Sequence, residues 1–396
     1  MKYAILSNSH KDSVEYTVSS LMSIATHYGH EISTPEDADI LCLSVCDITE
    51  VEWVKKIREK FPRKIIATGG HACVYYRIFK LYSDFVNIGH GFDFFSCQTI
   101  EEIRTLPCVV SDFSSPPYKA SEKVEWRVFP IANVTKRQKY YIGAFGCKNK
   151  CQFCLTSWTH KHQINPYARQ ATQKYKNITL VSNDSHNTDN RMTQSIMVRD
   201  FISPQKTLKK YAVYRLGIEF ATEHDRKKYG KPFTDDDFVT IFLKAQQYGV
   251  RLKLFCISGI NTIDEWHHLF ANIPYIYTKG KYEIKFTNLT FEMFTPLKKG
   301  RFEIDPAHYF DSTQVKQFVS YYKQRVWPLN SMPCSSPLKT MQRMAFCWSK
   351  TEQDILLAKK MKNLDEAVHA LKSVYFLQDY NDDIQFDLSG KEECRF

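Results

Sequence analysis

The stretch "FGCKNKCQFCLTSW", Phe145 to Trp158, places Cys147, Cys151 and Cys154 within eight residues. A disulfide joins two thiols, and tetrahedral zinc usually takes four ligands in two paired spacings. A cubane iron–sulfur cluster is normally held by four thiolates. Three thiolates leave one iron open to a substrate or cofactor, so the spacing favours such a cluster.

Zinc is the alternative for these thiols. His160 and His162 follow Cys154 by six and eight residues, which is not the usual pair spacing. A zinc-stabilised nucleic-acid-binding protein would use the three cysteines and one of these histidines. The chain has twelve cysteines, but disulfides are disfavoured in a reducing compartment, where clustered thiolates indicate a metal.

Bulk properties suggest two or three domains and a basic surface. The chain has 396 residues, a formal net charge of +11 and 14% aromatic residues. Such a surface suits an anionic partner, nucleic acid above all, or merely keeps the protein soluble. Because no apolar run is long enough to span a bilayer and the first residues form no clear signal, we expect a cytoplasmic protein without a membrane partner.

The cysteine motif resembles that of the radical S-adenosylmethionine (SAM) superfamily, CxxxCxxC with an aromatic residue, here Phe153, before the last cysteine. The resemblance implies a [4Fe-4S] cluster on Cys147, Cys151 and Cys154, with SAM chelated by the open iron. Reductive cleavage of SAM would then give a 5′-deoxyadenosyl radical that abstracts a hydrogen atom. A reductant protein such as flavodoxin would supply the electron.

Two downstream stretches supply the first further cofactor-binding candidates. "NITLVSND" reads as a strand whose end, at Asn183 and Asp184, falls where the superfamily approaches the SAM amino group. "YRLGIEFATEHDRKKYGKPF" is similar to the "GIES…GK" segment of the superfamily. That likeness assigns Glu219 to contact SAM, whereas an ordinary carboxylate at a strand end is the alternative.

Two later stretches continue the same order. "YGVRLKLFCISGINTIDEW" is similar to the superfamily's strand and turn, with Ile257 against adenine and Gly259 at the turn. Plain core is the alternative for Ile257. "YEIKFTNLTFEMFTPL" resembles the last barrel strand, ending at residues 295–297.

The alternation of strands and helices predicts a partial βα barrel over residues 131–300, with reaction groups at the carboxyl ends of parallel strands. Only 35 residues separate Asp184 from Glu219, which is short for two βα units. We therefore expect one unit to be shortened or missing, which would open the barrel on one side.

Residues 1–110 predict a separate α/β domain, a Rossmann-like doubly wound sheet, and residues 111–130 read as a linker. The domain resembles those of cobalamin-binding radical SAM enzymes and of methylthiotransferases. The second group holds another cluster here, but only Cys46 matches, and Ser9 or His10 and His71 stand at the other two positions. We therefore expect either cobalamin or a scaffold without a cofactor.

Residues 301–396 predict a mainly helical C-terminal region. "QVKQFVSYYKQRVWP" interleaves basic and aromatic residues, which suits either nucleic acid or a packed helix with a charged outer face. The leading hypothesis is a radical SAM isomerase or transferase that modifies a base in DNA or RNA, by rearrangement as in phage thymine hypermodification or by methylation. The alternative enzyme is a cobalamin-dependent methyltransferase acting on a small molecule or peptide.

Overall fold

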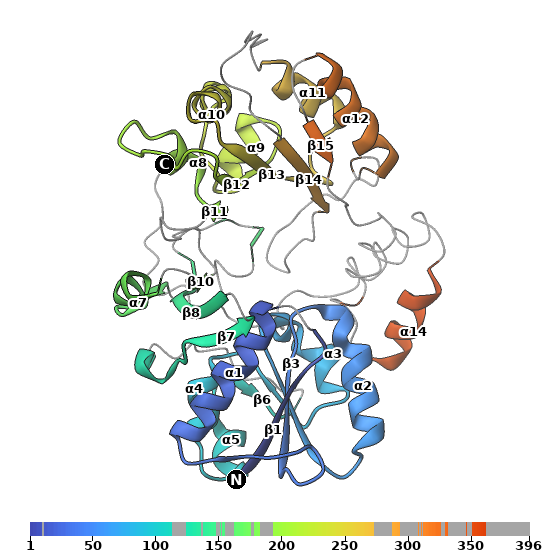
Figure 1. The fold of residues 1–396 in the computed structure, drawn as a ribbon. Coiled ribbons are helices and arrows are strands. Elements are labelled where there is room, and N and C mark those ends of the chain that lie inside the picture. Colours follow the sequence, from blue (N-terminus) through green and yellow to red (C-terminus); the bar gives the residue numbers. More distant parts are fainter. Residues whose placement is uncertain are drawn as a thin grey trace.

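The computed structural model describes residues 1–9, 12–112, 124–135, 138–147, 151, 153–154, 162–175, 178–182, 193–272, 287–293, 308, 310, 312–325, 329–331, 346 and 351–361. Figure 1 shows two bodies, with the first third of the chain at the bottom and the later barrel strands at the top. Strands of an intermediate sheet lie between them.

The first body is a six-stranded sheet in the order β2-β1-β3-β4-β5-β6. All its neighbouring strands are parallel except β5 and β6. The strands are β1 (Lys2–Ser7), β2 (Glu31–Ile32), β3 (Ile40–Ser44), β4 (Ile65–Gly69), β5 (Phe85–Asn87) and β6 (Val109–Val110). The helices are α1 (Asp12–His27), α2 (Val51–Lys60), α3 (Tyr76–Lys80), α4 (Gly91–Ser96) and α5 (Ile100–Thr105), with 3₁₀ turns η1 (Ile48–Glu50) and η2 (His71–Tyr75).

The barrel part consists of two sheets. The first contains β7 (Ala132–Thr135), β8 (Gln138–Phe145), β9 (Gln163–Ile164) and β10 (Ile178–Ser182), with η3 (Trp126–Val128) before it and α7 (Ala168–Lys174) within it. The second runs β11-β12-β13-β14-β15, all parallel. Its strands are β11 (Thr193–Ser195), β12 (Val213–Glu219), β13 (Arg251–Ser258), β14 (Thr287–Met293) and β15 (Leu329–Ser331).

Helices α8 (Val198–Ile202), α9 (Glu223–Lys228), α10 (Asp235–Tyr248), α11 (Ile263–Ala271) and α12 (Ser312–Arg325) accompany the second sheet, and α14 (Glu352–Lys360) lies against α2. Helix α10 shows why the elements form where they do. Thr234 and Asp237 make a reciprocal capping box at its start, and Gly249 ends it in the left-handed conformation, φ 59°. The sequence therefore determines where this helix begins and where it ends.

The predicted α/β architecture, with its Rossmann-like sheet, partial barrel and helical C-terminal segments, is confirmed. Continuous apolar runs became parallel strands, as β3 shows with all five residues buried. The short interval between β10 and β12 holds only the three-residue β11 and the five-residue α8 among the described residues. A strand after residue 300, β15, was not anticipated. The domain boundaries stay predictions.

Buried side chains form two cores. The first surrounds the six-stranded sheet and continues through Tyr141 and Leu180 into β8 and β10. The second fills the space between β12–β14 and helices α10–α12. Phe220 and Tyr229 follow β12 in the chain, yet they pack into the first core. The boundary between the cores therefore passes through the barrel, close to the end of β12.

The basic-aromatic stretch forms helix α12, whose packing distinguishes nucleic-acid binding from a packed helix with a charged outer face. Phe318 and Tyr322 are buried in the second core, and the Tyr322 hydroxyl donates to the carbonyl of His267 at 2.9 Å. Lys316 and Lys323 are exposed on the other side. The packed-helix alternative accounts for this pattern. No helix in the described part of the chain is both long and apolar enough to cross a membrane.

Candidate active site

Strand β8 delivers the first cysteine of the motif. It ends at Phe145, and Gly146 turns the chain with φ 62°, a conformation that suits glycine because it has no Cβ. Cys147 follows directly and is buried, with 6% of its surface exposed. The carboxyl end of a barrel strand is where active sites of such folds lie, so the turn places this thiol at the expected edge.

The other two cysteines lie in the same environment. The N–H of Cys154 donates to the Cys151 carbonyl at 3.2 Å, and the Cys151 thiol contacts the Gly230 carbonyl at 3.8 Å. Burial raises the pKa of Cys151 to about 11, Lys231 opposes this, and Cys154, Glu219 and Cys147 add to it. The three sulfurs, one carboxylate and one ammonium thus share a single electrostatic environment.

No three His, Cys, Asp or Glu side chains among the described residues are arranged to hold a single metal ion. A cubane does not require that arrangement, because each thiolate binds a different iron. His160 of the zinc alternative lies outside the described residues, and His162 is half-buried.

An ion pair lies beside the thiols. Strand β12 carries a bulge between Gly217 and Glu219, and Glu219 itself has φ 65°, unusual for a residue with a side chain. The bulge ends the strand and aims the carboxylate at Lys231, whose Nζ lies 3.2 Å from Oε1. The exposed fractions of the two side chains are only 15% and 19%, so water screens this pair weakly.

Gly217 makes space for the ion pair. A Cβ on this residue would stand 2.2 Å from Glu219 Oε1 and 3.0 Å from Lys231 Nζ. Phe153, the aromatic residue of the motif, lies on the other side, with its ring centroid 5.8 Å from Lys231 Nζ. It meets Phe220 edge-on at 5.3 Å. The cysteine loop and the end of β12 therefore contact each other through Phe153.

Asn261 connects the ends of two strands. Its Oδ1 accepts from the Ala221 N–H at 2.8 Å, and its Nδ2 donates to Asp225 at 2.7 Å. The residue is 1% exposed, so both bonds are protected from water. Asn261 was not among the site residues predicted from the sequence. In the structure it fixes the turn that follows Glu219.

The remaining predicted residues have separate outcomes. Ile257 is 7% exposed and packs in the first core, and Gly259 turns the chain after β13 with φ 108°. Asn183 and Asp184 lie outside the described residues, as do residues 295–297. Lys231 and Gly217 were missed as site residues, although both stand inside the quoted segments around "GIE…GK".

A second candidate site lies at the carboxyl edge of the six-stranded sheet. A cavity of about 470 Å³ opens there. Its lining includes Gly69, Gly70, Gly89 and Gly91, and it reaches Ile142 and Phe145 of β8 and Val181 of β10. Glycines let the backbone approach a ligand closely. The cavity is therefore shared between the Rossmann-like sheet and the strand that leads to Cys147.

His90 gives this cavity a neutral imidazole. Burial lowers the pKa of His90 to about 4, and its ring lies 4.8 Å from that of Phe145. Cys46 is exposed and lines the same cavity, whereas Cys42 and Cys73 are buried, which raises the pKa of both thiols.

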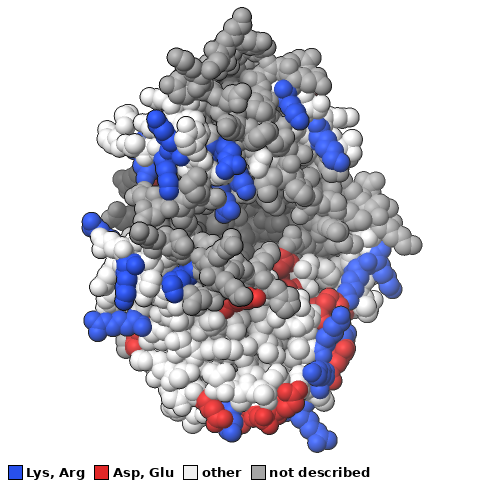
Figure 2. All heavy atoms as spheres, in the orientation of Figure 1, with Lys and Arg blue, Asp and Glu red and all other residues white. Residues whose placement is uncertain are grey.

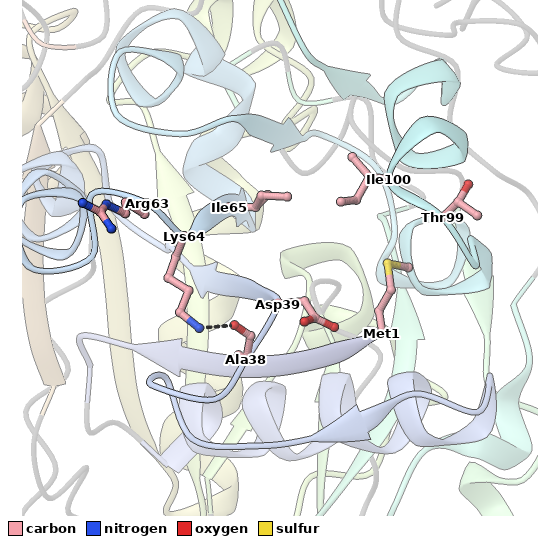
Figure 3. Close-up of a pocket in the computed structure, with 8 residues that line it drawn as sticks. All are labelled: Met1, Ala38, Asp39, Arg63, Lys64, Ile65, Thr99 and Ile100. Atoms are coloured by element: carbon pink, nitrogen blue, oxygen red, sulfur yellow. Dashed lines mark hydrogen bonds between the residues drawn. The ribbon is translucent and has the colours of Figure 1, made fainter.

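A further cavity, of about 540 Å³, lies at the opposite, amino edge of the same sheet. Figure 3 shows Lys64 reaching across to the Ala38 carbonyl, a hydrogen bond of 2.6 Å, beside Asp39 and Met1. In parallel α/β sheets ligands bind at the carboxyl edge, so we assign no site here.

Comparison with solved structures identifies the fold. A chain of the radical SAM methyltransferase TsrM from Kitasatospora setae, with cobalamin and a [4Fe-4S] cluster bound, aligns over 94% of this chain and 99% of its own at 10% identity and a TM-score of 0.52. A second TsrM structure, with tryptophan substrate and the SAM analogue aza-SAM bound, aligns over 73% and 72% at 10% identity and a TM-score of 0.51.

A structure of the cobalamin-dependent SAM radical enzyme OxsB with aqua-cobalamin aligns over 68% of this chain and 51% of its own, at 12% identity and a TM-score of 0.49. No protein-family model matches the sequence, and no curated protein does either. The two TsrM structures show the fold that this chain shares. This chain has the fold of a radical SAM enzyme with an N-terminal domain of the cobalamin-binding type, as the sequence resemblance predicted.

Proposed function

We propose that this protein is a radical SAM enzyme that cleaves SAM reductively at a [4Fe-4S] cluster. The observation that carries the proposal is the arrangement of Cys147, Cys151 and Cys154 beside the partly buried Glu219–Lys231 pair. Thiols for a cluster and a carboxylate for an amino group or a ribose thus lie together at the carboxyl ends of β8 and β12.

When bound, the cluster and SAM would supply a 5′-deoxyadenosyl radical for hydrogen abstraction. The chain's own residues hold and shield the groups. The cysteines would bind three irons, and Glu219 would accept a hydrogen bond from SAM. Phe153 and Phe220 form an edge-on apolar contact beside the cysteine loop. An acidic reductant protein such as flavodoxin suits the basic chain as electron donor.

We propose cobalamin as the second cofactor, in the cavity at the carboxyl edge of the six-stranded sheet. Its glycine-rich rim and its continuity with β8 support this assignment. A methyl carrier placed there would face the strand that presents Cys147. This arrangement favours methyl transfer to a small molecule or peptide over rearrangement without cobalamin.

Anaerobic reconstitution tests both cofactors. We expect four irons and four sulfides per chain, a paramagnetic signal on reduction, and formation of 5′-deoxyadenosine or of S-adenosylhomocysteine from SAM. The triple variant of Cys147, Cys151 and Cys154 to alanine should lose the iron but keep bound cobalamin. Stoichiometric zinc in place of iron would contradict the proposal and favour the zinc-stabilised protein.

A base in DNA or RNA is the second candidate substrate. Figure 2 shows Lys and Arg side chains over both the barrel part and the first body on the visible face, whereas the Asp and Glu side chains that can be seen lie over the first body. At the β8–α7 edge, Arg127 lies over the ring of Tyr167, and Lys139 and Lys174 both lie over Tyr175. Paired cations and aromatic rings can neutralise phosphates and stack bases.

A further inference from the structure

The Glu219–Lys231 pair has a second consequence for the site. Lys231 lies deep beside the cysteine loop, with Glu219 Oε1 at 3.2 Å and the Phe153 ring at 5.8 Å. Its backbone N–H donates to the Arg226 carbonyl at 2.7 Å, and the preceding carbonyl, of Gly230, contacts the Cys151 thiol. The ammonium is thus held close to a predicted cluster ligand on a fixed segment.

The surroundings keep Lys231 charged. Burial by itself would lower its pKa, but the ion pair with Glu219, whose Oε1 lies 3.2 Å from Nζ, more than offsets this and raises the pKa above the ordinary lysine value. A positive charge in a weakly solvated place acts over a longer range than one in water. The Lys231 charge would therefore interact electrostatically with a cluster bound by the three cysteines.

The Glu219 charge acts in the opposite sense, but it also faces the place assigned to SAM. A hydrogen bond from the SAM amino group to the carboxylate would compete with the ion pair and leave the Lys231 charge less compensated. SAM binding would therefore change the net electrostatic effect of the Glu219–Lys231 pair, whereas it would not change the effect of an isolated cation.

We propose that Lys231 is a positioning residue that raises the reduction potential of the cluster and holds the Glu219 carboxylate in place for SAM. This inference rests on the proposed function, because it requires a cluster on the three cysteines. Reduction adds an electron to the cluster, so a nearby cation stabilises the reduced state. Removing that cation should make reduction harder.

The test is a redox titration of the reconstituted enzyme with dithionite and mediators, followed by paramagnetic resonance. Lys231→Met should keep the iron content but lower the reduction equilibrium constant about tenfold, which for one electron is about 59 mV. Lys231→Arg keeps the charge and should titrate like the wild type. Lys228→Met is the matched control, because Lys228 is exposed on α9 and its charge is screened by water.

The double variant Glu219→Gln/Lys231→Met removes both charges. We expect the midpoint potential of its cluster to return toward that of the wild type. If Lys231→Met alone loses the cluster, this double variant provides the test instead. Wild-type and Lys231→Met enzymes with equal iron and equal midpoints would overturn the inference, as would a Lys231→Arg midpoint shifted as far as that of Lys231→Met. A wild-type chain without a cluster would instead contradict the proposed function.

Discussion

The Tyr16 hydroxyl oxygen accepts a hydrogen bond from the backbone N–H of Ile142 at 2.8 Å. It also donates to the carbonyl of Pro130 at 3.1 Å. Tyr16 lies on α1 of the first body and Ile142 on β8, three residues before the end of that strand. One phenol thus fixes the strand that carries the first cysteine against the Rossmann-like body.

Tyr16→Phe should destabilise this junction. The Tyr16 hydroxyl accepts the hydrogen bond of the Ile142 N–H, and only 1% of Tyr16 is exposed. Removing the hydroxyl would therefore leave a buried N–H without its acceptor. We expect the free energy of unfolding to fall by about 1–3 kcal/mol in urea denaturation. Tyr211→Phe is the control, since Tyr211 is 66% exposed and its change should have little effect. Equal losses in both variants would contradict the assignment.

Glu219→Gln should weaken SAM binding while the cluster remains. Charge-assisted hydrogen bonds contribute about 1.5–3 kcal/mol, which corresponds to roughly a ten- to hundredfold rise in the dissociation constant. Calorimetry with SAM under anaerobic conditions measures it. Asp236→Asn, an exposed carboxylate in the first turn of α10, should bind like the wild type. An unchanged dissociation constant for Glu219→Gln would remove this residue from the site.

Gly217→Ala should disturb the same carboxylate without unfolding the chain. The added Cβ would stand 2.2 Å from Glu219 Oε1, the far end of a flexible side chain, which can swing away. We expect a near-normal melting temperature with SAM affinity reduced as in Glu219→Gln. Gly69→Ala provides the contrast, because its nearest neighbour would be 3.8 Å away. Normal SAM binding by Gly217→Ala would show that the close approach has no function.

His90 should make stability depend on pH. Its pKa is about 4 in the folded chain and about 6.5 when unfolded, so between these values the unfolded chain binds more protons. Stability due to the neutral ring is complete above pH 6.5 and falls as the pH drops toward 4, by on the order of 3 kcal/mol. His90→Gln should lose that component. The check is urea denaturation across this range, and parallel wild-type and variant curves would refute it.

If nucleic acid is the substrate, affinity should fall linearly with salt on logarithmic axes. Lys209 and Lys210 are exposed between α8 and β12. Reversing both charges should weaken binding and flatten the salt slope, because fewer phosphates are neutralised. Iron content and uncoupled SAM cleavage should not change. A wild-type enzyme with no affinity for DNA or RNA at low salt would leave a small molecule or peptide as substrate.

The strands that build the site could be read from the sequence because each is a buried apolar run with a polar end. This gave β8, β10, β12, β13 and β14, and the cysteine spacing gave the loop. Glu219 was assigned instead from the likeness of its segment to the "GIES…GK" segment of the superfamily.

The partners of Glu219 could not be read in that way. Lys231 looks like one of several lysines in "DRKKYGK", and only the folded chain shows that it is mostly covered, with 19% of its side chain exposed, while Lys227 and Lys228 are exposed. Gly217 looks like an ordinary strand glycine until the bulge turns Glu219 back over it. The role of Asn261 could be recognised only once the turn after β13 was seen to lie against the turn after β12. Such contacts depend on tertiary packing across strands and carry no local periodicity.

The division of the interior into two cores has a thermodynamic consequence. The cysteines follow β8, which belongs to the first core, whereas Glu219 ends a strand of the second. A ligand held by both contributes its binding free energy to their cohesion. On heating, the unloaded chain should melt in two transitions, and the loaded enzyme should approach one. The cofactors would then join the two halves of the molecule into a single cooperative unit.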